Sequence, residues 1–433
     1  MVFATISLLL VVIWRLTSKG RKFPSVSFAM LAGTLLFVGL GLELDRYENL
    51  TLSVVIMVAF YVALVMGAHF ARRLRFNGQG MHNLGEFLSR SFIFRYTVLT
   101  FFAIYALLPS FGVLISGQSF GQILRATWAS DTQAATSQML VETSLQSLSG
   151  INAFVNAVQV QLSGFWYLAL GLALMIRSRL VFPVLAVYIF GTFLSGSSSR
   201  TIPMMALLLP FMIWALSARR PRFRGIVVLG MVGLALLLGM DYLVKGRQGE
   251  EAQGGIAQRV ERTLRTDFAY GGLGLKLGMD AQPGSLERGI EYLVRIAVLP
   301  IPRVLWPSKP STNPNQIFTE WYTERSLEEV RTIILFTPLG EALFFFGYLG
   351  IALVPFLYGF TAILFERIYS TSEVYKGLLI QVYLWAFISM RLTYFNLFEF
   401  LVVQNFVLIT ILVAGQHFMR NKYRRLPSGE SIA

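Results

Sequence analysis

Long apolar runs separated by short polar connections dominate this chain. A helix that crosses a bilayer needs about 20 mostly apolar residues, and about eleven runs approach that length, centred near residues 8, 35, 60, 104, 165, 188, 210, 234, 355, 384 and 408. The first run, Met1 to Trp14, has neither a basic segment before it nor a small-residue cleavage site after it, so we interpret it as a spanning helix. The pattern predicts an all-α polytopic membrane protein.

One polar, arginine-rich insert of roughly ninety residues interrupts this pattern, from Lys245 to about Leu335. It divides the chain into three predicted parts. Residues 1–244 hold about eight spans, residues 245–335 form a long loop outside the bilayer, and residues 336–433 hold about three spans and a basic tail.

The insert itself contains periodic segments. Ile256, Val260, Leu264 and Phe268 recur every four residues with arginines between them, which predicts a cationic amphipathic helix along the membrane surface. A second periodic run ends before Pro300 and consists of Leu286, Ile290, Leu293, Val294, Ala297 and Val298. A third run, from about Asn315 to Leu335, is helical in composition.

Basic residues gather at alternate connections between the apolar runs. The clusters are Arg15/Lys19/Arg21/Lys22, Arg72/Arg73/Arg75, Arg177/Arg179, Arg219/Arg220/Arg222/Arg224 and Arg420/Lys422/Arg424/Arg425. By the positive-inside rule they are cytoplasmic. We therefore expect the N-terminus and the insert on the far side of the membrane, which in a bacterium is the periplasm, and the C-terminus in the cytoplasm. The net charge of +14 is explained by these clusters, which also attract anionic lipid, so nucleic acid is not an expected partner.

The composition narrows the chemistry further. Hydrophobic residues make up 55% and charged residues 14% of the chain, too little polar surface for a soluble globule of this size. No cysteine is present, and all three histidines, His69, His82 and His417, fall on the cytoplasmic side of this topology. The outer side shows no pattern of metal ligands, which predicts metal-independent chemistry without a cofactor, in which arginines stabilise an anion.

Two segments carry cations beside unusual backbone. The turn Ser195 to Thr201 is rich in small residues and contains Arg200, which fits either an anion site or a tight turn between spans. Farther on, prolines bracket Arg303, Trp306 and Lys309. Arginine and lysine bind phosphate and an indole face can stack on a sugar, so we favour a binding role over a rigid interfacial loop.

Ionisable residues also lie at the outer ends of predicted spans. Glu341 stands just inside an apolar run, where a carboxyl is costly and is a candidate general base. The alternative is a carboxylate favoured by the N-terminus of its own helix. Arg391 lies near Tyr394 and Glu399 and could simply pair with that glutamate. Arg247 is similarly ambiguous.

These short motifs together resemble the Wzy-type oligosaccharide repeat-unit polymerases of the O-antigen polymerase family. The resemblance rests on Gly196 to Thr201, on Pro302-Arg303-x-Leu305-Trp306-Pro307-x-Lys309-Pro310, and on Thr337-Pro338-x-Gly340-Glu341 followed by Phe346-Gly347-Tyr348-x-Gly350. The hydropathy pattern of the chain, with one long outer loop late in the sequence, also resembles that of the family over nearly the full length.

The resemblance implies a GT-C-like glycosyltransferase architecture and the joining of glycan units carried on undecaprenyl diphosphate. Membrane lipid and a protein that regulates chain length are further implied partners. Because the leaving group is a diphosphate, cations would neutralise its charge. Arg200, Arg303 and Lys309 are the first candidates, and Arg247 and Arg391 the next. Glu341 would deprotonate the acceptor hydroxyl, and Trp306 and Tyr394 would bind substrate.

Two rival functions remain open. An O-antigen ligase would share the fold and the lipid-linked donor, but that family carries a histidine in its large periplasmic loop and this insert has none. A transporter or flippase of lipid-linked glycan would use the buried charges to line a path. Transporters often show paired halves with matching broken helices, and no such repeat is visible in this sequence.

Overall fold

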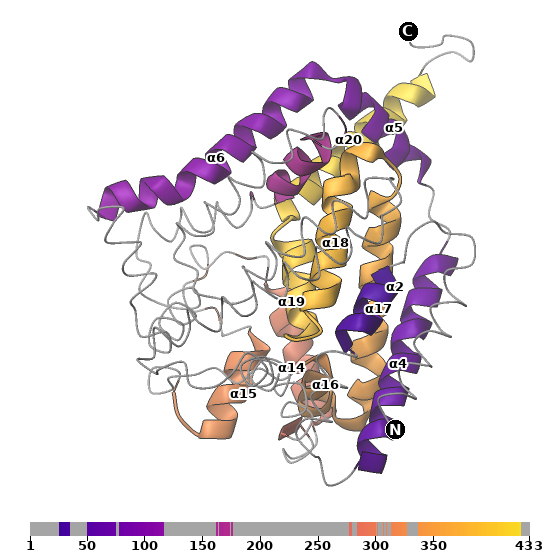
Figure 1. Cartoon of the computed structure of the whole chain (residues 1–433), viewed down its shortest axis with the longest axis vertical. Coiled ribbons are helices and arrows are strands. Elements are labelled where there is room, and N and C mark those ends of the chain that lie inside the picture. Colours follow the sequence, from indigo (N-terminus) through magenta and orange to yellow (C-terminus); the bar gives the residue numbers. More distant parts are fainter. Residues whose placement is uncertain are drawn as a thin grey trace, which may run out of the picture.

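The computed structural model describes residues 26–34, 50–74, 78–116, 162, 164–173, 175, 277–278, 284–299, 301, 306, 309, 313–326 and 337–425. Every regular element in these stretches is helical, as the apolar runs predict (Figure 1). The first four are α2 (Val26–Thr34), α4 (Leu50–Arg73), α5 (Gln79–Arg90) and α6 (Phe92–Ser116). Later in the chain come α14 (Leu286–Ala297), α15 (Pro314–Thr323), α16 (Pro338–Phe346), α17 (Gly350–Tyr369), α18 (Lys376–Ile388), α19 (Tyr394–Phe398) and α20 (Phe406–Arg425).

Two helical segments in this described part are long and apolar enough to cross a membrane. They are Val54–Arg73 within α4, and Pro338–Tyr369, in which a 3-10 turn at Gly347–Leu349 joins α16 to α17. The number rises to four if each of two bent pairs crosses as one span. Those pairs are Gln79–Arg90 with Phe94–Ile104, and Tyr394–Val403 with Phe406–His417, the latter bent by 52°. The chain therefore has the helices of a membrane protein.

Several of the predicted spans coincide with these helices. The runs centred near 60, 104, 355 and 408 lie in α4, α6, α17 and α20. The run near 165 is a shorter apolar helix, Gly164–Ala173, and the run near 384 is the 13-residue α18. The first part of the run near 35 is α2, and the rest of that run, like the runs near 8, 188, 210 and 234, lies outside the described residues. The total of eleven and the GT-C architecture therefore stay predictions.

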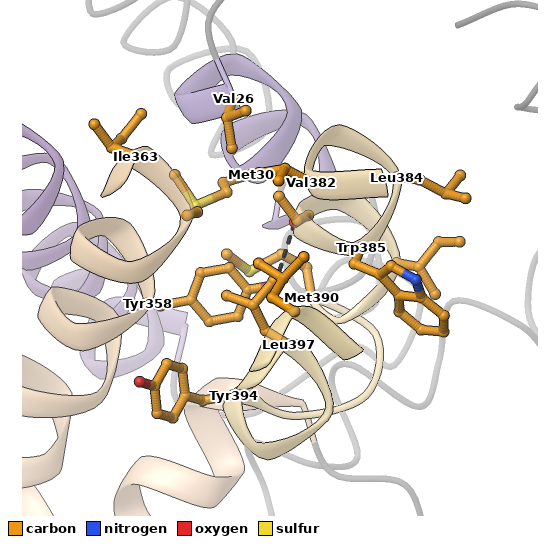
Figure 2. Packing of buried hydrophobic residues seen from close by; sticks show 14 of the residues in the cluster. Val26, Met30, Tyr358, Ile363, Val382, Leu384, Trp385, Met390, Tyr394 and Leu397 are labelled. Atoms are coloured by element: carbon orange, nitrogen blue, oxygen red, sulfur yellow. Dashed lines mark hydrogen bonds between the residues drawn. The ribbon is translucent and has the colours of Figure 1, made fainter. Parts of the chain in front are cut away.

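Helix α17 lies at the centre of the packing and contacts α4 most extensively. Gly67 and Gly359 face the opposite backbone so closely that a Cβ on either would meet a main-chain oxygen, of Phe356 or of Leu64. Small residues that bring helix backbones together are typical of membrane helix pairs. On its other side α17 packs Tyr358 and Ile363 against residues of α2, α18 and α19, as Figure 2 shows.

The two ends of this bundle differ in chemistry. At one end Arg367 of α17 donates to the main-chain oxygens of Ala71 and Leu74, so its charge stabilises the C-terminus of α4. His82 of α5 contacts the Thr371 oxygen at 3.0 Å at the same end. Helices α14, α15 and α16 lie toward the opposite end, the lower one in Figure 1.

Two helices of the insert can be compared with their predictions. The second periodic run is confirmed as α14, which Ser285 caps and which ends before Pro300. In the described part of the third run, α15 ends at Thr323, because Glu324 takes a left-handed conformation with φ 53°. Residues 327–335 of that run lie outside the described residues. The predicted helix near 256–268 lies outside the described residues.

Candidate functional site around Glu341

Glu341 belongs to α16, a helix that is buried along its whole length. Pro338 stands in its first turn, where the missing N–H costs no hydrogen bond. The Glu341 N–H donates to the Thr337 oxygen at 3.0 Å, which closes that turn. The sequence of α16 is otherwise apolar, so the helix carries one carboxyl into the core, and the residue is 0% exposed.

Three donors from two other helices meet the Glu341 carboxylate. The Tyr394 N–H donates to Oε2 at 2.6 Å and the Phe395 N–H donates to Oε1 at 3.2 Å, both from the first turn of α19. The Tyr292 hydroxyl of α14 also donates to Oε1. A buried carboxylate is stable only when its oxygens accept hydrogen bonds, and these three donors supply them. Glu341 therefore ties α14 and α19 to α16.

Tyr292 reaches Glu341 because α14 packs directly on α16. Its ring stacks on Phe345, with the centroids 4.2 Å apart, and meets Phe346 edge-on at 5.9 Å. Gly289 lies one turn before Tyr292 and makes room for the Phe346 ring. Burial, together with the nearby Glu341 charge, raises the pKa of Tyr292 well above its usual range. The hydroxyl therefore keeps its proton and remains a donor.

The start of α19 is held in place by side chains as well as by Glu341. The Thr393 hydroxyl accepts from the Asn396 N–H and caps the helix. The Tyr394 hydroxyl lies 3.1 Å from the Thr361 hydroxyl of α17, and its ring lies 6.0 Å from that of Tyr358 (Figure 2). The Tyr394 backbone is thus part of the site, while its side chain anchors α19 to α17.

Lys309 and Trp306 lie in the loop after α14. The Lys309 ammonium donates to the main-chain oxygens of Leu299 at 2.9 Å and Ile301 at 3.0 Å, just beyond the C-terminus of α14. A cation there also interacts favourably with the helix dipole. Lys309 is buried and within electrostatic reach of Glu399, whereas Trp306 is 36% exposed.

An aromatic surface lies on α15 and α16 beside this site. Phe318 is buried against Phe344, while Trp321 and Tyr322 on the next turn of α15 are exposed. The Arg288 guanidinium of α14 lies 4.9 Å from the Phe344 ring centre and 6.0 Å from that of Trp321. The arginine therefore brings positive charge over both aromatic rings, of which Trp321 is exposed.

The structure brings some predicted site residues together and does not describe others. Glu341 contacts the Tyr394 backbone, and Arg391 is buried in the turn just before α19. Lys309 and Trp306 share one loop, in which the Lys309 N–H donates to the Trp306 oxygen at 3.1 Å. Arg200, Arg247 and Arg303 lie outside the described residues.

Tyr292, Arg288 and the Phe395 N–H were not foreseen from the sequence. A signal for Tyr292 exists: Gly289, Tyr292 and Ile296 form a second stripe along α14, separate from the periodic apolar positions. Nothing local indicates the Phe395 N–H, because its partner lies 54 positions earlier in the chain.

The described residues include no group of three His, Cys, Asp or Glu side chains arranged to hold a metal ion. Comparisons with protein families, with curated proteins and with solved structures found no match to this chain.

Proposed function

We propose that this protein is a membrane glycosyltransferase that joins oligosaccharide repeat units carried on undecaprenyl diphosphate into a surface polysaccharide. One observation carries the proposal. Glu341, a fully buried carboxylate near the start of a candidate span, accepts a hydrogen bond from the Tyr292 hydroxyl. A hydroxyl hydrogen-bonded to a carboxylate is the starting arrangement for general-base catalysis of glycosyl transfer.

In this proposal the Tyr292 hydroxyl stands in for the acceptor sugar hydroxyl. Both groups donate to a carboxylate oxygen, and Tyr292 occupies Oε1 in the structure. When the acceptor binds, Tyr292 yields its place and Glu341 accepts the proton of the sugar hydroxyl. The freed oxygen attacks the anomeric carbon of the donor, and the bond from that carbon to the diphosphate oxygen breaks. The buried Thr337 hydroxyl has no hydrogen-bond partner among the described residues, which agrees with the binding of a polar ligand next to Glu341.

The departing diphosphate needs positive charge. Arg200, Arg303 and Lys309 remain our first candidates, with Arg247 and Arg391 next. In the structure the Lys309 ammonium is held by two main-chain oxygens, an arrangement that also fixes the loop between α14 and Trp306. Trp306, Trp321 and Tyr322 offer exposed rings on which sugars could stack.

We place the Glu341 end of the molecule at the periplasmic face of the bacterial inner membrane. Arg72 and Arg73 end α4, and Arg367 lies against that terminus, so basic residues collect at the other end. Basic residues mark the cytoplasmic side of membrane proteins. This orientation puts the carboxylate on the side where undecaprenyl-linked units are polymerised.

Deletion of the gene in its host tests this function against its rivals. We expect the surface polysaccharide, separated on a gel, to lose its ladder of lengths while a single capped repeat unit remains. The whole chain supplied on a plasmid should restore the ladder. Loss of all capping would instead indicate a ligase or a flippase, and an unaltered ladder would contradict the proposal.

A further inference from the structure

Helix α14 has three distinct faces, although it is only 12 residues long. The first face is buried and consists of Gly289, Tyr292 and Ile296, which pack toward α16. The second is charged, with Glu287 and Glu291 exposed and Arg295 half-buried, and Glu291 and Arg295 form an ion pair at 2.5 Å. The third is apolar and also exposed.

The exposed apolar face contains four large side chains spaced along the whole helix. Leu286 is 66% exposed, Ile290 54%, Leu293 39% and Val294 55%. Their spacing of three or four residues places them on one side of the helix. The apolar residues that recur with helical periodicity in the sequence therefore stay exposed. Helix α14 packs on the protein through its other face, that of Gly289, Tyr292 and Ile296.

The position of α14 indicates what covers this stripe. The helix packs against α16, which begins the candidate span Pro338–Tyr369, so it lies where that span enters the bilayer. Its length of about 18 Å is too short to cross a membrane. The apolar and charged faces run side by side along its axis, as a helix at the boundary between acyl chains and water requires.

We propose that α14 lies in the interfacial layer of the bilayer and that its Leu286, Ile290, Leu293 and Val294 face contacts lipid acyl chains. The charged face then points to the water above. The loop that follows agrees with this placement, because Ile301 and Trp306 are exposed beyond the end of α14 and tryptophan is enriched at membrane interfaces. This inference does not depend on the proposed enzymatic activity.

Spin labelling tests the proposal directly, because the chain has no cysteine of its own. The full chain would carry a nitroxide at Ile290→Cys or Leu293→Cys, with Glu287→Cys and Glu291→Cys as controls on the charged face. Val62→Cys, exposed on the candidate span of α4, is the reference for a lipid-facing site. Each labelled protein is reconstituted in vesicles of phosphatidylethanolamine and phosphatidylglycerol.

The readout is the ratio of nitroxide collisions with oxygen, which concentrates in lipid, to those with a water-soluble nickel chelate. We expect the logarithm of this ratio to be positive at residues 290, 293 and 62 and negative at 287 and 291. Preference for the nickel chelate at 290 and 293 would overturn the proposal. So would low collision with both reagents, because the face would then be covered by protein, including a second copy. Positions 290 and 293 are labelled in separate variants, so that if one variant fails to fold, the other still tests the proposal.

Discussion

Glu341→Gln is expected to reduce transfer by about 10²- to 10⁴-fold, the usual contribution of a general base. The amide has nearly the shape of the carboxyl but cannot accept the proton of an acceptor hydroxyl. In the deletion strain, the variant should yield single capped repeat units and no ladder. The amount of folded variant in the membrane must be measured alongside, because the substitution also affects packing.

The structural cost of Glu341→Gln can be estimated from its three donors. Tyr292 and Phe395 both donate to Oε1, and a glutamine oxygen can still accept both bonds. The amide nitrogen would then face the Tyr394 N–H, which loses its acceptor. An unsatisfied buried donor costs roughly 1–3 kcal/mol. The expected loss of transfer is larger than this loss of stability explains, provided that the folded variant accumulates.

Two variants separate a catalytic role from a structural one. Glu291→Gln makes the same chemical change on the exposed face of α14 and should leave the ladder intact. Tyr292→Phe removes one donor but keeps the carboxyl and both N–H donors of α19. We expect it to retain transfer. If Tyr292→Phe and Glu341→Gln lose transfer in proportion to their loss of stability, Glu341 is only a structural link.

Gly347→Ala is expected to destabilise the protein by at least about 2 kcal/mol. Gly347 has φ 60° and ψ −148°, a backbone conformation that residues with a Cβ rarely adopt. An added Cβ would also lie only 2.8 Å from the Gly284 oxygen. Since Gly284 leads into α14, the substitution pushes α14 away from α16 and separates Tyr292 from Glu341. A lower thermal unfolding midpoint of the purified protein in detergent checks this.

The neighbouring residue provides the control for Gly347→Ala. Tyr348 is exposed, so Tyr348→Ala should change the unfolding midpoint little. Equal midpoints for Gly347→Ala and the wild type would show that the contact between Gly284 and Gly347 does not hold α14 on α16.

The elements that can be predicted from the sequence are those for which one segment contains all the information. The run from Leu286 to Val298 has helical periodicity and ends before Pro300, so α14 was predicted with nearly correct bounds. Its orientation was not predictable, because periodicity does not distinguish a stripe that packs on protein from one that stays exposed. Burial of Gly289 and Tyr292 depends on α16, more than 40 positions later.

In the candidate site, too, the sequence indicated the residue with the unusual local context but not its partners from distant segments. Glu341 was noticed because a carboxyl inside an apolar run is costly. The alternative, a carboxylate favoured by the N-terminus of its own helix, fits the position of Glu341 in the first turn of α16. Its N–H donors from α19 lie 53 and 54 positions later and gave no sequence signal. Lys309 was predicted to bind phosphate because it shares a proline-bracketed segment with Arg303 and Trp306. Its contacts with the main-chain oxygens of Leu299 and Ile301 gave no sequence signal.

Transfer by the purified protein tests the central claim most directly. The wild-type chain would be reconstituted in vesicles with a lipid extract of the deletion strain, which should accumulate single lipid-linked repeat units. The account predicts a ladder of lipid-linked products with wild type and only single units with Glu341→Gln. Single units that stay unjoined by folded wild-type protein, or a ladder formed equally well by Glu341→Gln, would contradict it.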